Sequence, residues 1–257
     1  MSRNHLRVTG DTSSFRTDSA QGLEHNTWRR CDAKDSREQP AYSLAEAARY
    51  LRLSPATLRS WTVGRDYPTA KGIRQFTPLI RPADTSPPTL SFANLIEAHV
   101  LRSLRTEHGV PLEAVRRALR YAEKQLKIDR LLGREELLAS GGQLFLDRYG
   151  ELVNLSASGQ LAIRKVFEAH LRRVEWGNLR HPVRLFPFVL VDGASDDRPI
   201  LIDPQVSFGR PVIRAGFIST RIVAERIDAG ESVEDLARDY GLPAADIEQA
   251  VLYERAA

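Results

Sequence analysis

Hydrophobic side chains recur at helical spacing twice within residues 43–61, on either side of a short turn. The first stretch begins with Ser43 and has Glu46 three positions later, which is the spacing of a capping box. In the second stretch Ser54 precedes Pro55, and proline is tolerated in the first turn of a helix because its missing N–H is not needed there. The pattern therefore predicts two short helices joined by a tight turn.

The two predicted helices face each other through their apolar positions, so that the polar side chains of the second helix project elsewhere. The apolar positions are Leu44, Ala47, Ala48, Leu51, Leu58 and Trp61. A pair of this kind is typical of the helix-turn-helix motif, whose second helix presents side chains near its N-terminus to base edges. We therefore expect DNA contacts from Thr57, Arg59 and Ser60.

The next segment has the pattern of a wing, because VGRDYPTAKGIRQFTPLI is a loop between two glycines followed by an alternating strand. Residues 41–80 contain six basic and two acidic side chains, and this difference of +4 equals the net charge of the whole chain. Basic side chains supply phosphate contacts. We therefore add Arg65, Lys71 and Arg74 to the expected DNA-binding residues; the alternative is a solvated basic surface.

Two longer helical patterns follow a proline-rich turn at residues 81–90. The first is capped by Ser91, runs to about residue 107 and includes His99, which we expect to be a hydrogen-bonded core residue. The second runs from about Pro111 to Ile128. Its basic face is expected to be solvated, with a second phosphate contact as the alternative. That face carries Arg116, Arg117, Arg120, Lys124 and Lys127.

The pattern in the rest of the chain predicts a middle section of strands and helix, followed by a helical C-terminal section. We expect a hairpin in residues 143–156, a helix in 160–176 and a strand in 183–191. Residues 200–213 predict two short strands around a turn. Three helices then follow, with Gly230 closing the first, Ser232 capping the second and Leu242–Pro243 starting the third.

The final helix differs from a DNA-reading helix in its charge. Residues 243–257 contain three acidic side chains and one basic side chain, a net charge of −2, which repels phosphates at close range. We therefore assign DNA binding to the N-terminal helix pair. The C-terminal pair is assigned to protein contacts, either self-association or a partner protein.

Composition narrows the classes of protein further. A hydrophobic content of 42%, a charged content of 27% and a pI near 9.4 fit a globular protein that tolerates a polyanionic partner. The single cysteine, Cys31, cannot form an internal disulfide or a cysteine-rich zinc site. We expect no membrane span, no metal and no cofactor, and a cytoplasmic location. The chain offers no nucleophile placed with a base, so we expect no enzyme.

These patterns predict an α+β protein that is mainly α-helical, with a winged helix-turn-helix at the N-terminal end and a three-helix domain at the C-terminal end. The expected divisions are a disordered arm at residues 1–40, a DNA-binding domain at 41–130, a mixed middle section at 131–198 and a helical domain at 199–257.

Two groups of motifs resemble known families. YSLAEAARYL, SPATLRSW and GRDYPT resemble the DNA-binding domain of MerR-type regulators over about residues 41–127. IDPQVSFGRPVI, GESVEDLARDYGL and IEQAVLYE resemble a small domain of long-unknown function that occurs in bacterial antitoxins. The combination resembles a VapB-type antitoxin subgroup over about residues 41–254.

That resemblance implies the antitoxin of a type II toxin–antitoxin pair, which binds a PIN-type ribonuclease toxin directly and represses the shared operon. A homodimer would match a palindromic double-stranded operator. An arginine that enters the carboxylate-rich nuclease site is one means of neutralisation. The candidates are Arg184, Arg210 and Arg214, with Arg210 first. The alternative is a MerR-like transcription regulator without a toxin, whose middle section senses a small effector.

Overall fold

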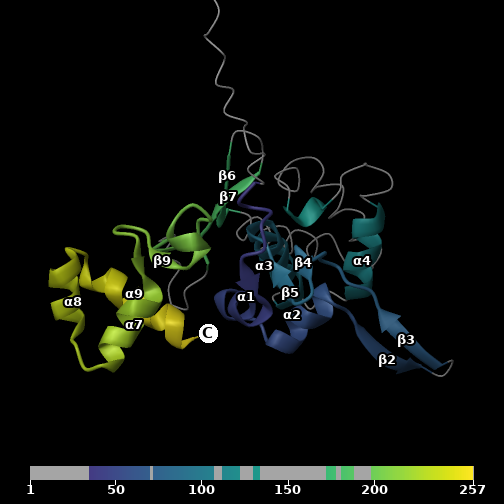
Figure 1. The fold of residues 1–257 in the computed structure, drawn as a ribbon, viewed down its shortest axis with the longest axis horizontal. Helices are drawn as coiled ribbons and strands as arrows, with labels where there is room; N and C mark the ends of the chain where they lie inside the picture. The colour runs from purple at the N-terminus through teal and green to yellow at the C-terminus, as the bar shows by residue number, and fades with distance from the viewer. Residues whose placement is uncertain are drawn as a thin grey trace, which may run out of the picture. The chain divides into compact units, whose positions relative to one another are not determined.

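The computed structural model describes residues 35–69, 72–106, 112–121, 130–133, 172–177, 181–187 and 198–256. Most of the predicted N-terminal arm, the predicted hairpin at residues 143–156 and Cys31 lie outside these ranges. The helices are α1 Leu44–Tyr50, α2 Pro55–Thr62, α3 Phe92–Thr106, α4 Leu112–Tyr121, α7 Thr220–Asp228, α8 Val233–Tyr240 and α9 Ala244–Arg255 (Figure 1).

Short strands complete the described structure and make it a mixture of helix and strand, in agreement with the α+β prediction. They are β1 Tyr42–Ser43, β2 Arg65–Thr69, β3 Gly72–Phe76, β4 Asp84–Thr85, β5 Pro88–Leu90, β6 Val174–Trp176, β7 Pro182–Leu185, β8 Ile200–Leu201, β9 Val212–Ile213 and β10 Ile218–Ser219. They form two three-stranded sheets, in the orders β1-β5-β4 and β10-β9-β8, and the two antiparallel pairs β2-β3 and β6-β7.

The helix-turn-helix pair forms through the predicted local interactions. The Ser43 hydroxyl accepts a hydrogen bond from the Glu46 backbone N–H, and the Glu46 carboxylate accepts one from the Ser43 N–H, which completes the capping box. Ser54 caps α2, and Pro55 occupies its first turn. Both predicted helix starts are confirmed.

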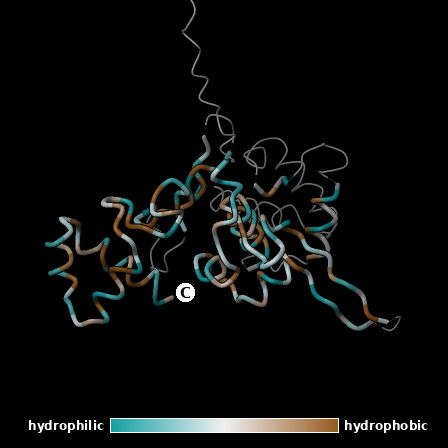
Figure 2. Tube along the Cα trace, viewed as in Figure 1, coloured by the Kyte–Doolittle hydropathy of each residue, from teal (hydrophilic) through white to brown (hydrophobic). Residues whose placement is uncertain are grey.

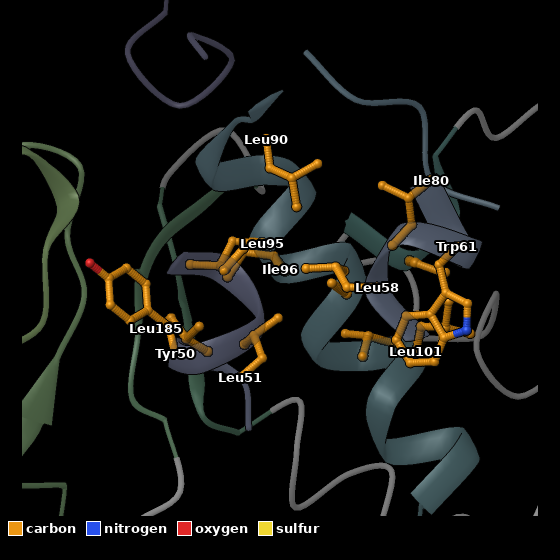
Figure 3. Packing of buried hydrophobic residues seen from close by; sticks show 14 of the residues in the cluster. Tyr50, Leu51, Leu58, Trp61, Ile80, Leu90, Leu95, Ile96, Leu101 and Leu185 are labelled. Carbon is orange, nitrogen blue, oxygen red and sulfur yellow. The ribbon is translucent and has the colours of Figure 1, made fainter. Parts of the chain in front are cut away.

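The N-terminal core is built from the apolar faces of α1, α2 and α3 (Figure 3). Leu58 and Trp61 of α2 are 0% and 1% exposed, as their predicted inward orientation requires. The core also includes Val174 of β6 and Leu185 of β7. The N-terminal helices thus share one hydrophobic cluster with strands β6 and β7, which lie beyond residue 170 of the chain.

Two predictions about local structure are wrong. The proline-rich stretch has its predicted turn at Ser86–Pro87, but the flanking residues, predicted as part of that turn, form β4 and β5, and Leu90 pairs with Tyr42 of β1 with both side chains buried. The end of the helix predicted at residues 160–176 is instead strand β6, which pairs with β7. Strand pairing overrides the local pattern in both cases, with the distant strand β1 for β5 and with the neighbouring strand β7 for β6.

The C-terminal helices α7, α8 and α9 pack around a hydrophobic cluster of their own, which includes Val223, Leu236 and Ile247. Figure 2 shows hydrophobic and hydrophilic positions alternating along these helices. Ser232 caps α8 by accepting a hydrogen bond from the Asp235 N–H, and Gly241 ends α8 with a left-handed backbone. Gly230, at φ +100°, lies just beyond the end of α7. The three predicted helices are therefore present.

Candidate nucleic-acid interface

Helix α2 presents a polar face away from the core. The Thr57 hydroxyl lies 2.8 Å from that of Ser54, and the Ser60 hydroxyl donates to the Thr57 carbonyl at 2.8 Å. Arg59 on the same helix is exposed. The two hydroxyls are therefore positioned by local hydrogen bonds, whereas the guanidinium of Arg59 reaches into solvent.

The predicted wing is a two-stranded hairpin. Strands β2 and β3 pair from Arg65 opposite Phe76 to Thr69 opposite Gly72, and the hairpin projects from the helices (Figure 1). Arg65 is exposed, with its guanidinium carbon 6.0 Å from the centroid of the Phe76 ring. Arg74 belongs to β3 by its backbone, whereas its side chain, like the whole of Lys71, lies outside the described structure.

The hairpin starts at a backbone position that only glycine fits. Gly64 has a φ of +88°, and a Cβ atom there would lie 2.3 Å from the carbonyl oxygen of Phe76. The chain leaves the hairpin at residues 77–80, where the backbone N–H groups of Leu79 and Ile80 both donate to the Trp61 carbonyl, at 2.8 and 3.0 Å. These contacts fix the base of the wing against the end of α2.

Sequence reasoning missed the role of Arg116, which it placed on a solvated basic face of α4. Its guanidinium lies over the Phe76 ring, 4.1 Å from the centroid, and donates to the Thr77 carbonyl. Arg116 therefore braces the wing from α4. The spacing between residues 76 and 116 in the sequence contains no signal for this contact.

The basic residues of segment 41–80 do not all serve one surface. Arg49 pairs with Glu254 of α9 at 3.0 Å. Arg52 lies with its guanidinium 5.6 Å from the centroid of the Tyr253 ring, and burial lowers its pKa. The guanidinium nitrogens of Arg52 are buried and have no hydrogen-bond partner among the described residues. Two of the six cations counted in the sequence thus face the C-terminal helix rather than the surface of α2 and the wing.

The three arginines proposed for toxin binding differ in how they are held. Arg184 pairs with Asp203 at 2.9 Å and Glu175 at 3.1 Å, and Arg210 pairs with Glu46 at 3.2 Å. Arg214 is exposed and lies 5.6 Å from the centroid of the Phe186 ring. Within the described residues, no carboxylate pairs with Arg214.

The same ranges also bear on metal binding and on membrane insertion. No group of three or more histidine, cysteine, aspartate or glutamate side chains there could hold a metal ion. No helix in the described part of the chain is both long and apolar enough to cross a membrane. The acidic residues Asp192, Asp196 and Asp197, which lie close together in the sequence, are outside these ranges.

Two families match parts of the chain. Residues 40–119 match a family described as "Putative DNA-binding HTH domain", which covers the helix pair, the wing, α3 and most of α4. Residues 200–253 match a family described as "Protein of unknown function (DUF433)", which covers most of the C-terminal helical domain. The N-terminal helix-turn-helix is therefore of a DNA-binding type.

Proteins of Mycobacterium tuberculosis are similar over most of the chain. One, named "Putative antitoxin VapB45", is 28% identical over 232 residues, which cover 82% of this chain and 92% of that protein. A second, named "Uncharacterized protein Rv2308", is 25% identical over 223 residues, covering 85% of this chain and 91% of that protein.

The crystal structure of Rv2018 from the same organism has a similar fold, with a TM-score of 0.60 and 23% identity, covering 83% of this chain and 98% of that one. The chain is thus a distant relative of a protein named as an antitoxin, and its fold has a counterpart among solved structures.

Proposed function

We propose that this protein is the antitoxin of a type II toxin–antitoxin pair, which binds a PIN-type ribonuclease toxin and represses its own operon as a DNA-bound homodimer. One observation carries the proposal: the similarity to a protein named as a VapB antitoxin extends over 82% of the chain, well beyond the helix-turn-helix alone. In this role the protein is a regulator and not an enzyme.

For DNA binding, we propose that α2 and the wing contact the duplex in the manner of MerR-type proteins. Arg59 and Arg65 are exposed, and no carboxylate of the described residues pairs with either of them. Exposed guanidinium groups are free to replace counterions on phosphates, which supplies affinity. Thr57 and Ser60 lie on the same helix and are suited to base edges, while Lys71 and Arg74 extend the basic surface along the wing.

Arg214 is the strongest candidate for the toxin contact. Use of Arg184 or Arg210 would break an ion pair within the chain, whereas Arg214 is exposed and pairs with no described carboxylate. A planar guanidinium binds carboxylates in pairs of hydrogen bonds, which suits the acidic site of a metal-dependent nuclease. Arg214 therefore replaces Arg210 as our first choice.

DNA binding is tested by the salt dependence of affinity for the DNA upstream of the protein's own gene. Arg59→Ala is expected to weaken binding and to lower the slope of log K against log salt by about 1, the value for one lost phosphate contact. Arg49→Ala is the matched control, because Arg49 pairs with Glu254, and its slope should stay at the wild-type value. A wild-type affinity that is insensitive to salt would refute DNA binding.

Toxin binding is tested by purification of the tagged protein from its native host, with mass spectrometry of whatever copurifies. A stoichiometric small nuclease that the protein inhibits is the expected result. Arg214→Ala should then reduce inhibition, and Arg238→Ala, an exposed arginine on α8, should not. Recovery of the protein with DNA but with no nuclease would favour a regulator without a toxin.

A MerR-like regulator that senses a small effector is the second candidate, and one observation favours it. A cavity of about 670 Å³ lies beside the end of α2 in the DNA-binding half. Most of the middle section, where an effector site was expected, lies outside the described residues. A ligand in this cavity is compatible with either function.

A further inference from the structure

The cavity has the size and the lining of a small-molecule site. At about 670 Å³ it falls within the usual range of roughly 300–1,000 Å³ for ligand pockets. Its walls come from the end of α2, the segment Pro78–Ala83, strands β4 and β5, and helices α3 and α4. Apolar side chains such as Leu79, Pro82, Leu119 and Leu132 alternate with a few polar groups, which is the composition such pockets share.

Four polar residues of the described lining, Glu38, Asn94, Glu97 and Arg130, form one connected cluster around the Arg130 guanidinium. Its Nε donates to Glu97 Oε1 at 2.8 Å, its Nη2 to Glu97 Oε2 at 3.2 Å, and its Nη1 to Glu38 Oε2 at 2.7 Å. Asn94 Nδ2 adds a further bond to Glu97 Oε2 at 2.9 Å. All three guanidinium nitrogens of Arg130 are therefore already donating to carboxylates.

This cluster has acceptor capacity left over and few donors. Two carboxylates face one guanidinium, so the cluster of Glu38, Glu97 and Arg130 has a formal charge of −1 when both acids are ionised. Each carboxylate has about four lone-pair directions, and the hydrogen bonds from described residues use one on Glu38 and three on Glu97. A ligand that donates hydrogen bonds fits this cluster, and an anionic ligand does not.

Arg81 is the remaining charged residue among the described lining residues. Arg81 and Glu38 are both exposed, so solvent screens both charges, and the carboxylate that solvent screens least is that of Glu97. The Glu97 side chain is only 6% exposed, and its carboxylate is correspondingly costly to leave partly unpaired. Desolvation raises the pKa of Glu97, and the bonds from Arg130 and Asn94 act against that rise.

We propose that this cavity binds a compact organic cation, with the apolar body of the ligand between the proline-rich segment and Leu119 and its cationic nitrogen on the carboxylates of Glu38 and Glu97. The site is connected to the DNA-binding motif. Asn94 Nδ2 donates to the Arg81 carbonyl at 2.8 Å, and the adjoining residues Leu79 and Ile80 are bonded to the end of α2. A ligand would thus contact the segment that fixes the wing.

The test uses three molecules of the same shape and different charge: benzamidine as the cation, benzamide as the neutral analogue and benzoate as the anion. Thermal unfolding of the full chain is measured with each. At about ten times its Kd, benzamidine should raise the Tm by roughly 3 °C, with a smaller shift from benzamide and none from benzoate. The assay contains neither DNA nor toxin, so its failure would leave the proposed function intact.

Variants of the cavity lining test whether the shift in Tm arises from benzamidine bound in this cavity. Glu38→Gln should reduce the preference for benzamidine over benzamide several-fold, whereas Glu234→Gln, at an exposed position on α8, should leave it unchanged. Leu119→Trp fills the cavity from α4 and should abolish the shift. Ala83→Trp fills it from the exposed edge and provides a second test if Leu119→Trp disturbs the core.

Two outcomes would overturn the proposal. The first is a wild-type shift with benzamidine that is absent or no larger than the shifts with benzamide and benzoate. The second is a benzamidine shift that survives in a folded cavity-filling variant, which would place the binding elsewhere on the protein.

Discussion

The carboxylate of Glu254 on α9 accepts a hydrogen bond from Arg49 on α1 at 3.0 Å, and its other oxygen accepts one from the Thr220 hydroxyl of α7. The neighbouring Tyr253 hydroxyl donates to the Tyr50 carbonyl at 3.1 Å. Polar contacts from two successive residues of the last helix therefore join the C-terminal helical domain to the first helix of the DNA-binding motif.

Glu254→Gln should weaken the contact between α9 and α1. The Glu254 side chain is 9% exposed and that of Arg49 is 36% exposed, so solvent screens part of the pair. We expect a loss of about 1 kcal/mol in the free energy of unfolding, less than for a fully buried pair, measured by urea denaturation. Glu248→Gln, exposed on the same helix, should cost less than about 0.5 kcal/mol. Equal losses of unfolding free energy in the two variants would show that the Arg49–Glu254 pair adds no stability.

Arg116→Lys should loosen the wing. Lysine keeps the charge but lacks the planar group that stacks on Phe76 and bonds the Thr77 carbonyl. We expect a loss of about 1 kcal/mol in stability and weaker DNA binding, measured by denaturation and by fluorescence anisotropy. The control is Arg120→Lys, an exposed position on α4, and an identical effect from that variant would contradict the bracing role.

The acid stability of the protein should depend on Glu46. Burial opposes ionisation of this side chain, but hydrogen bonds from Ser43 and the charge of Arg210 outweigh it and lower its pKa below the ordinary value of 4.5. A lowered folded-state pKa contributes stability above pH 4.5, and this contribution is lost as the pH falls through the folded-state pKa.

Glu46→Gln keeps a side chain that suits the capping box but cannot ionise. Its free energy of unfolding, measured by urea denaturation at a series of pH values, should fall less steeply on acidification below pH 4.5 than that of the wild type. Parallel curves for the two proteins would exclude a contribution from Glu46.

Gly64→Ala should be more destabilising than Gly230→Ala. Both glycines have a positive φ, at +88° and +100°, so alanine strains the backbone at each by about 1 kcal/mol. At Gly64 the added Cβ would also meet the Phe76 carbonyl oxygen at 2.3 Å, whereas nothing lies within 4 Å at Gly230. Thermal denaturation of the two variants measures the difference, and equal losses would mean that the hairpin moves to accommodate a methyl group.

Local signals in the sequence were sufficient for elements whose ends are closed by their own side chains. Ser43 with Glu46, Ser54 with Pro55, and Ser232 with Asp235 lie within one helical turn of each other, so their spacing alone predicts where α1, α2 and α8 begin. The strands β5 and β6 were missed because they are stabilised by pairing with β1 and β7, and their own residues have no alternating pattern long enough to reveal it.

Local patterns in the sequence were enough to predict the helix-turn-helix, the wing after it and the three helices that follow residue 218. The packing of the fold, in contrast, decides which cations are held by distant segments of the chain and which stay exposed. Arg49, Arg52 and Arg116 look the same as Arg59 and Arg65 in a count of charge, yet the first three are engaged with Glu254, Tyr253 and Phe76. The reason is physical: a helix period specifies the face on which a side chain lies, whereas its partner is set by whatever distant segment packs against that face.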